Sequence, residues 1–282
     1  MRARPEGLRA GTRAITSLQN DRVKLIRSLE MRKARRETGL FVAEGTSLLI
    51  SARAAGWAPK ILAFLAASSG GEPAARLAAA AEGAGAECLE VSPTVLAKLA
   101  GKDNPQTMLG VFEQRWASPP DAAAIAEDAV WVALETPRDP GNLGSIIRSC
   151  DAVAAKGLIL IGQSCDPYAR EAVRASMGSI FNVALVRMDA QQFLAWRQRW
   201  KGDVVGTHLD ARQDFRRVAY RGPSLLLMGS EGPGLSATLA AACSRLVKIP
   251  MAGKLDSLNL AVATALMLYE LRKDRLRLSA PS

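Results

Sequence analysis

The sequence predicts an α/β protein in which a parallel-sheet domain follows a smaller α/β domain. In the C-terminal half, short apolar runs such as VWVAL, GLILIG and SLLLMG alternate with segments of helical periodicity. Strands that are apolar along their whole length are typical of a parallel sheet covered by helices on both faces. In the first half, shorter strand-like runs alternate with alanine-rich helical segments, which indicates a second α/β unit.

The chain of 282 residues is long enough for two domains. We expect a basic tail over 1–14, the first domain over 15–115, a linker over 116–127 and the second domain over 128–278. The linker assignment rests on Pro119 and Pro120, which interrupt regular structure. An organellar presequence is the alternative for the tail, but Glu6 and the early glycines favour disorder.

The first domain opens with a predicted helix over 21–36, in which Val23, Ile26 and Leu29 recur at helical spacing. Cations crowd the rest of this helix. Strands are then predicted at LFVAE, KILAFL, ECLEV and LGVFEQ. In the second domain, six strands are predicted at VWVAL, GLILIG, VALVRM, DVVGT, SLLLMG and RLVKIP.

Composition restricts the function. The net charge of +10 favours a polyanionic partner, with nucleic acid ahead of a membrane. Four cysteines without CxxC spacing and a single histidine argue against a Cys/His metal site, so no metal is expected. Unpaired cysteines fit a reducing, cytoplasmic location. The one histidine, His208, is expected in a solvated loop, and a catalytic role is the alternative.

Polar and glycine-rich segments follow three of the predicted strands. They are RDPGNLGSIIRS, GSEGPGLS and MAGKLDSLNLAVA. Each alone could be a simple turn, but ligands of open parallel sheets bind beyond the carboxyl ends of the strands, so we expect one shared site. Neither a P-loop nor a dinucleotide fingerprint is present. Glycine-rich turns favour an adenine-type ligand held by main-chain groups.

These three segments, in this order, resemble the signature motifs of the SPOUT superfamily, and specifically those of its SpoU/TrmH group of RNA ribose 2′-O-methyltransferases. The stretch VRASMGSIFNVALV between the first two motifs is similar as well. The resemblance extends more loosely to the first half, through SLQNDRVKLIRSLEMRKARRETGLFVAEG and NPQTMLGVFE, which are similar to the N-terminal substrate-binding domain of the ribosomal-RNA members.

The resemblance implies a deep trefoil knot in the second domain, a first domain like ribosomal-protein folds, and a homodimer whose active sites combine residues of both subunits. It also implies S-adenosylmethionine as cofactor. Matched position by position, it assigns catalytic roles to Asn142, Arg148, Glu231 and Asn259. It assigns cofactor contacts to Met228, Gly229, Ile249, Met251, Ser257 and Leu258.

The chemistry of Arg148 allows two interpretations. Removing the proton from a guanidinium near neutral pH costs about 7 kcal/mol from its reference pKa, so a general base is the less favoured role. A cation that stabilises the developing alkoxide and contacts a phosphate is preferred. Glu231 would then be a proton relay or would orient Arg148. The last helix needs an N-cap, which Asp256 or Ser257 is expected to provide, with Asn259 inside its first turn.

A solvated charged face is the usual explanation for a helix as basic as 21–36. The density of cations there favours contact with RNA phosphates, and few aromatic residues argue for recognition of backbone and shape. The residues expected to bind RNA are Lys24, Arg27, Arg32, Lys33, Arg35 and Arg36.

Methylation of a ribose 2′-oxygen in ribosomal RNA, with large-subunit RNA favoured, is therefore the leading functional prediction. Transfer RNA is the rival substrate. A knotted RNA-binding or ribosome-assembly protein without catalysis is the alternative from another class.

Overall fold

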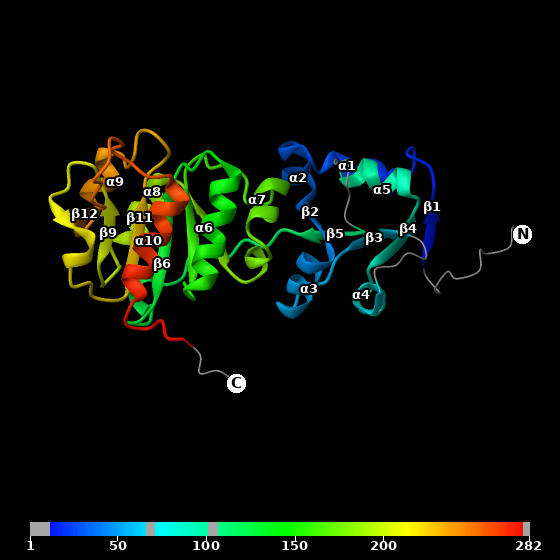
Figure 1. The fold of residues 1–282 in the computed structure, drawn as a ribbon, viewed down its shortest axis with the longest axis horizontal. Helices are drawn as coiled ribbons and strands as arrows, with labels where there is room; N and C mark the ends of the chain where they lie inside the picture. Colours follow the sequence, from blue (N-terminus) through cyan, green and yellow to red (C-terminus); the bar gives the residue numbers. More distant parts are fainter. Residues whose placement is uncertain (1–11, 66–70, 101–106, 279–282) are drawn as a thin grey trace, which may run out of the picture. The chain divides into compact units, whose positions relative to one another are not determined.

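The computed structural model describes residues 12–65, 71–100 and 107–278 (Figure 1). The chain divides into two compact units. Unit 1 comprises Met1–Gln114 and Tyr168–Phe181, and unit 2 comprises Arg115–Pro167 and Asn182–Ser282. None of the helices in the described ranges combines the length and apolar content needed to cross a bilayer.

Unit 1 is built on a five-stranded mixed sheet in the order β1-β4-β3-β5-β2. β5 runs antiparallel to β2 and β3, and the other pairs are parallel. The four predicted strands are present; the sheet comprises β1 (Arg13–Ile15), β2 (Leu40–Glu44), β3 (Ile61–Leu65), β4 (Glu87–Val91) and β5 (Met108–Glu113).

Strand β1 corrects the predicted bound of the basic tail. Arg13 and Ala14 pair with Leu89 and Glu90 of β4. These two residues therefore belong to the sheet of unit 1 and not to the tail. The Arg13 side chain also forms an ion pair with Glu87 at 3.3 Å. Residues 1–11 of the predicted tail lie outside the described residues.

The prediction of one helix over 21–36 is wrong, because two helices replace it. The buried residues Val23, Ile26 and Leu29 form a single apolar stripe that ends at Leu29. Arg35 then folds back, and its Nη1 donates to the carbonyl oxygens of Leu29 and Glu30 at 2.8 and 2.7 Å. The helices of this part of unit 1 are α1 (Asp21–Ser28), α2 (Arg32–Thr38), α3 (Thr46–Ala54), α4 (Gly71–Gly83) and α5 (Pro93–Ala100).

A segment from the second half of the sequence, Tyr168–Phe181, belongs to unit 1. It carries α7 (Arg170–Ala175). The Tyr168 ring lies 4.7 Å from that of Phe41, and the Phe181 ring lies 5.3 Å from that of Phe112. Trp57 Nε1 donates to the carbonyl oxygen of Phe181 at 2.9 Å. This segment therefore completes the aromatic core of unit 1.

Unit 2 contains a seven-stranded sheet in the order β10-β12-β9-β11-β6-β7-β8, and every pair in it is parallel. The predicted α/β class and parallel sheet are confirmed. All six predicted strands are present, and only the two-residue β10 was not predicted. The strands are β6 (Val130–Glu135), β7 (Gly157–Ile161), β8 (Ala184–Met188), β9 (Val204–Thr207), β10 (Gln213–Asp214), β11 (Ser224–Met228) and β12 (Arg245–Lys248).

Helices cover both faces of this sheet. α6 and α10 pack side by side on one face (Figure 1). On the other face, Phe193 of α8 and Leu239 of α9 join the buried cluster formed by alternate strand residues. The helices are α6 (Pro140–Ala152), α8 (Ala190–Arg197), α9 (Ala237–Ala241) and α10 (Leu260–Arg272).

The stretch 116–127, expected to be a linker, packs within unit 2. Ala122 is buried in its core cluster. Trp196 Nε1 donates to the carbonyl oxygen of Pro120 at 2.7 Å, and Arg199 forms an ion pair with Asp121 at 2.8 Å. These contacts hold the stretch against unit 2.

Candidate active site

The loops that follow β9, β11 and β12 surround one cavity of about 790 Å³ in unit 2. All strands of the sheet are parallel, so these loops emerge at the same edge, as expected from the sequence. All six residues expected to contact the cofactor line this cavity: Met228, Gly229, Ile249, Met251, Ser257 and Leu258. Glu231 and Asn259 line it as well.

The loop over 229–236 forms one wall and is held in a narrow shape. Ser230 and Gly234 exchange backbone hydrogen bonds of 3.2 and 3.1 Å. Gly232 and Gly234 adopt φ values of +94° and +72°, which favour glycine. A Cβ atom at Gly229 would overlap the backbone of Gly234 and Leu235. Only a glycine therefore lets the loop fold back this closely.

The opposite wall, residues 251–258, has an irregular backbone. Within the described chain, this segment makes no backbone–backbone hydrogen bond. Main-chain N–H and C=O groups are obligatory hydrogen-bonding groups, so those that face the cavity are available to a ligand. Ser257 Oγ donates to Asp256 Oδ1 at 3.1 Å.

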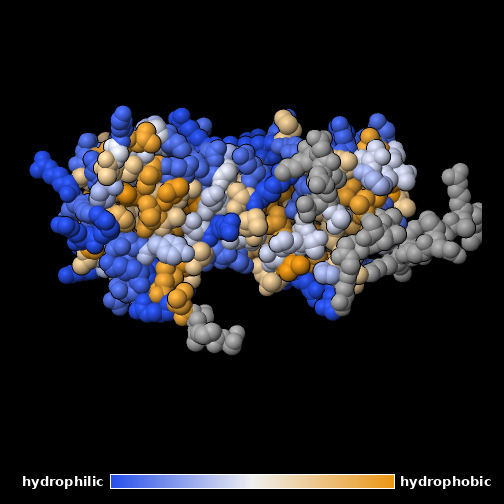
Figure 2. All heavy atoms as spheres, viewed as in Figure 1, coloured by the Kyte–Doolittle hydropathy of each residue, from blue (hydrophilic) through white to orange (hydrophobic). Residues whose placement is uncertain are grey.

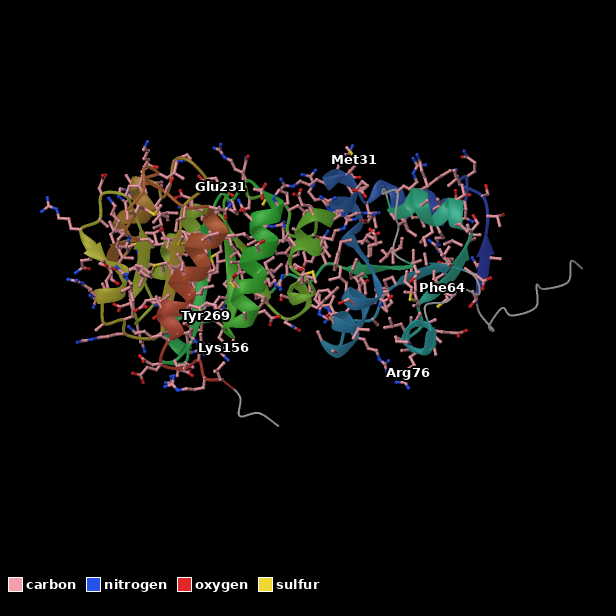
Figure 3. The ribbon with its side chains drawn as sticks, in the orientation of Figure 1. Met31, Phe64, Arg76, Lys156, Glu231 and Tyr269 are labelled. Atoms are coloured by element: carbon pink, nitrogen blue, oxygen red, sulfur yellow. The ribbon has the colours of Figure 1, made fainter. Side chains whose placement is uncertain are left out.

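Three of the four predicted catalytic residues form a hydrogen-bonded chain. Asn259 Nδ2 donates to Asn142 Oδ1 at 2.8 Å, and Asn142 Nδ2 donates to Glu231 Oε1 at 3.2 Å. The backbone N–H of Arg138 donates to the other carboxylate oxygen of Glu231 at 3.1 Å. Figure 3 shows Glu231 at the end of the sheet where α10 begins. This series of hydrogen bonds links all three predicted motifs.

The hydrogen bonds to Glu231 keep it ionised. Partial desolvation raises the pKa of this carboxyl group, but the backbone N–H groups of Glu231, Arg138 and Asp139 and the Asn142 amide outweigh it and lower the pKa below its ordinary value. Its carboxylate oxygens hold the Asn142 amide and the backbone N–H of Arg138. Both roles expected for Glu231, a proton relay and a group that orients Arg148, stay predictions.

Two asparagines of the site lie at helix starts. Asp139 caps α6 by accepting from Asn142 N at 2.6 Å, so Asn142 lies in the first turn of that helix. Asn259, not Asp256 or Ser257, caps α10, and its Oδ1 accepts from Ala261 N and Val262 N. The Asn259 amide therefore caps the helix with its oxygen and contacts Asn142 with its nitrogen.

Comparison with known proteins agrees with this geometry. Residues 129–269 match the SpoU rRNA Methylase family, and residues 20–110 match an MRM3-like substrate binding domain. The chain belongs to the SpoU family. The predicted resemblance is thereby confirmed, including the N-terminal substrate-binding domain.

Relatives of this SpoU protein cover most of its length. The structure of an AdoMet-bound rRNA methyltransferase from Sinorhizobium meliloti is 41% identical, with a TM-score of 0.85 over 95% of this chain and 100% of that chain. A 23S rRNA (uridine(2479)-2′-O)-methyltransferase of Streptomyces viridochromogenes is 36% identical over 67% of this chain and 68% of that protein. The 23S rRNA (guanosine(2553)-2′-O)-methyltransferase RlmP of Bacillus subtilis is 27% identical over 92% of this chain and 98% of that protein.

S-adenosylmethionine is the cofactor of this SpoU methyltransferase, as predicted. The cavity suits it in two respects. Its volume of about 790 Å³ lies in the range of ligand pockets, about 300–1,000 Å³. Its walls are glycine-rich turns and main-chain groups, interspersed with apolar side chains such as Met228 and Leu258.

Arg148 is not brought together with the other predicted catalytic residues. It lies on α6 six residues after Asn142, its side chain is exposed, and it does not line the cavity. Six residues of helix turn the side chain about 120° away from that of Asn142. Among the residues that the structure describes, the Arg148 side chain forms neither a hydrogen bond nor an ion pair.

The loop after β9 was missed by the sequence analysis, although Thr207, His208, Leu209 and Asp210 line the cavity. Thr207 Oγ1 lies 3.5 Å from Met228 Sδ, and the backbone N–H of Asp210 donates to His208 Nδ1 at 3.2 Å. His208 is thus a partly exposed loop residue beside the site. The strand order, which places β9 next to β11, is the missing information.

One of the six residues expected to bind RNA is misassigned. Arg35 is 4% exposed and holds the end of α1, so it is not available to a phosphate. The other five are exposed on α1 and α2: Lys24, Arg27, Arg32, Lys33 and Arg36. Lys24 and Lys33 lie 3.6 and 3.9 Å from Asp21 and Glu37, and such exposed pairs exchange readily for phosphate.

Proposed function

We propose that this SpoU methyltransferase transfers a methyl group to a ribose 2′-hydroxyl of ribosomal RNA beside Asn142, Glu231 and Asn259. The observation that carries the proposal is the hydrogen-bonded chain from Asn259 through Asn142 to Glu231 at the rim of the cavity. Asn142 and Asn259 offer a fixed pair of amide groups at the point where a substrate would meet the cofactor.

Residues Met228, Gly229, Ile249, Met251, Ser257 and Leu258 would hold the cofactor, whose sulfonium supplies an activated methyl group. Transfer to an oxygen nucleophile is an in-line displacement: the bond from the 2′-oxygen to the methyl carbon forms as the bond from sulfur to that carbon breaks, and the hydroxyl proton passes to solvent water. Alignment of the ribose therefore dominates catalysis. Asn142 and Asn259 orient that ribose. Glu231 fixes Asn142 and, being ionised, adds negative charge that favours a nearby cation.

Arg148 is the proposed cation. A guanidinium retains its proton at neutral pH, so Arg148 stabilises the developing alkoxide and contacts the adjacent phosphate. Because Arg148 is exposed and outside its own cavity, the proposal places it in the active site of a second copy of the chain. A homodimer follows from that placement.

The outer face of α10 supports the homodimer. Val262, Leu266 and Tyr269 are 49%, 41% and 53% exposed, and their spacing puts them on one side of the helix. Figure 2 shows hydrophobic side chains gathered over this part of unit 2, and Figure 3 shows Tyr269 on α10. A contiguous apolar face of this kind is typical of a protein interface.

The trefoil knot belongs to the same proposal. β12 pairs with β9, whereas α10, which follows it in sequence, packs against α6. The chain must therefore return across the carboxyl ends of β9 and β11 between residues 249 and 259. We propose that this return passes through the loop after β11.

Ribosomal RNA is favoured over transfer RNA for two reasons. Among the relatives that match almost the whole chain, the Bacillus subtilis and Sinorhizobium meliloti proteins are named as enzymes of ribosomal RNA, whereas a Synechocystis relative is named for both transfer and ribosomal RNA. Unit 1 adds exposed cations on α1 and α2, suited to the backbone of folded RNA. A ribosomal substrate also agrees with the predicted cytoplasmic location.

The test is transfer of tritiated methyl groups to separated ribosomal and transfer RNA, with the methylated nucleotide mapped by primer extension at low nucleotide concentration. We expect label in ribosomal RNA with the wild-type chain and none with Arg148→Ala, whose affinity for the cofactor stays within a few fold. Label in transfer RNA alone would contradict the substrate, and loss of cofactor binding in Arg148→Ala would contradict the role of that residue.

A further inference from the structure

Glu135, the last residue of β6, makes a contact that the proposed mechanism does not use. Its Oε2 accepts a hydrogen bond from the backbone N–H of Ser236 at 2.8 Å. Leu134 pairs with Met228 across the sheet, so Glu135 lies beside the point where the chain leaves β11. Its carboxylate reaches across to the far end of the 229–236 loop.

The contact is one half of a reciprocal arrangement. Glu135, at the end of β6, accepts from the backbone N–H of Ser236 in the loop after β11. Glu231, from the loop after β11, accepts from the backbone N–H of Arg138 in the loop after β6. Each of the two chain segments thus supplies a carboxylate that accepts a main-chain N–H of the other, and hydrogen bonds to a charged group are about twice as strong as neutral ones.

The two carboxylates act on different parts of the site. Glu231 lines the cavity and binds Asn142, whereas Glu135 does not line the cavity. Ser236 is the N-cap of α9, and its hydroxyl accepts from Leu239 N at 3.3 Å. Fixing Ser236 therefore fixes the end of the loop whose other end, Gly229, forms the cavity wall.

The backbone around Glu135 keeps its side chain in place. Thr136 adopts a φ of +45°, a conformation that a β-branched residue seldom takes. Its N–H donates to the carbonyl oxygen of Ile161 on β7 at 3.0 Å. The chain turns sharply away from the sheet at this point, and the carboxylate of Glu135 is left facing the loop after β11.

We propose that Glu135 is a positioning residue for the cofactor site: it closes the 229–236 loop into the shape that binds S-adenosylmethionine, and it touches neither cofactor nor RNA. The inference rests on the cofactor site described above. Loss of the Glu135 carboxylate weakens cofactor binding, whereas the hydrogen bonds of Glu231 to Arg138 N and Asn142 Nδ2 are independent of Glu135 and keep Glu231 and Asn142 in place.

The experiment measures binding of S-adenosylhomocysteine, the reaction product, by calorimetry without RNA, and separately the KM and kcat of methyl transfer. We expect Glu135→Ala to raise Kd and the cofactor KM about ten-fold, with kcat at saturating cofactor within about three-fold of wild type. Glu135→Gln keeps an acceptor oxygen and should recover part of the loss.

Glu127→Ala is the matched control, because Glu127 is an exposed glutamate that precedes the amino end of the same strand. Hydrogen exchange gives a readout besides activity: Glu135→Ala should speed exchange in peptides covering 229–236 and not in those covering β7. In a Ser236→Ala background the backbone donor remains, so Glu135→Ala should still raise Kd.

An unchanged Kd in a folded Glu135→Ala chain would overturn the inference, as would a fall in kcat without a change in Kd. Faster exchange throughout the sheet would also overturn it, because that result indicates general destabilisation. Failure to methylate any RNA while Kd follows this pattern would instead count against the proposed function alone.

Discussion

Asn259 Nδ2 donates a hydrogen bond to Asn142 Oδ1 at 2.8 Å, across 117 positions of sequence. The same Asn259 side chain caps α10. One amide therefore joins the start of the last helix to the first turn of α6, and both ends of the contact lie at the proposed ribose site.

Substitutions at Asn259 separate capping from catalysis. Asn259→Ala should lower the free energy of unfolding by about 1 kcal/mol, because the cap of α10 is lost. Asn259→Ser retains a capping oxygen and should restore that stability, but it lacks the amide that reaches Asn142. Both variants should lose at least about ten-fold in kcat. Denaturant unfolding and methyl-transfer kinetics are the measurements, and full activity in Asn259→Ser would contradict the role assigned to the amide.

Gly229 should not tolerate a side chain. Gly229→Ala places a Cβ against the backbone of Gly234 and Leu235, so the loop must open and the cofactor cavity must change shape. We expect destabilisation of about 1–3 kcal/mol and loss of S-adenosylhomocysteine binding in calorimetry. Gly253→Ala is the control, since a Cβ there meets nothing within 4 Å. Normal cofactor binding by Gly229→Ala would show that this wall is not rigid.

The pH dependence of the site follows from Glu231. Its pKa is lowered in the folded chain, so its stabilising contribution is fully present above the ordinary carboxyl pKa of about 4.3. That contribution is lost only as the pH falls through the lowered value. The difference in unfolding free energy between wild type and Glu231→Gln should therefore stay constant above about pH 5 and shrink in acid. A difference that changes around neutral pH would mean that Glu231 titrates there.

The exposed face of α10 gives a test of the homodimer. Leu266→Asp puts a charge in the middle of the apolar face, so light scattering should report a monomer. The rate of methyl transfer should fall when the dimer is lost, because Arg148 can no longer reach the active site of a second copy. Leu278→Asp is the control, since Leu278 is 99% exposed and follows α10. A dimeric and active Leu266→Asp chain would argue for a different interface.

The consecutive residues Arg35 and Arg36 should behave differently. Arg35→Ala leaves the carbonyl groups of Leu29 and Glu30 without their donor, and we expect about 1–3 kcal/mol lower stability. Arg36→Ala removes the same charge from an exposed position. It should leave stability unchanged. A plot of the logarithm of the RNA association constant against the logarithm of salt concentration should become less steep, its slope falling in magnitude by about 1. RNA binding that is indifferent to salt between about 50 and 200 mM would argue against phosphate contacts.

The strands and the ligand-bearing loops could be predicted because each is a local pattern. Runs such as SLLLM are apolar throughout, and their burial in the parallel sheet is what that pattern requires. Segments that follow parallel strands emerge at the same edge of the sheet. The sequence could therefore predict that Gly229 and Leu258 line one cavity.

Other features depend on contacts between distant residues. The break between α1 and α2 is set by Arg35 returning to Leu29, and no local rule distinguishes that arginine from its neighbours. Asp256, Ser257 and Asn259 are all good capping residues, and the choice of Asn259 depends on where the chain crosses the sheet. The role of the loop after β9 required the strand order.

The segment Tyr168–Phe181 has a consequence for dissecting the molecule. A cut near residue 115 yields a first piece without Tyr168 and Phe181, whose rings pack against Phe41 and Phe112, and a second piece that carries those rings without their partners. Neither half is therefore a self-sufficient module. Exchange of the substrate-binding part between related enzymes should succeed only when a third, internal stretch of sequence is transplanted with it.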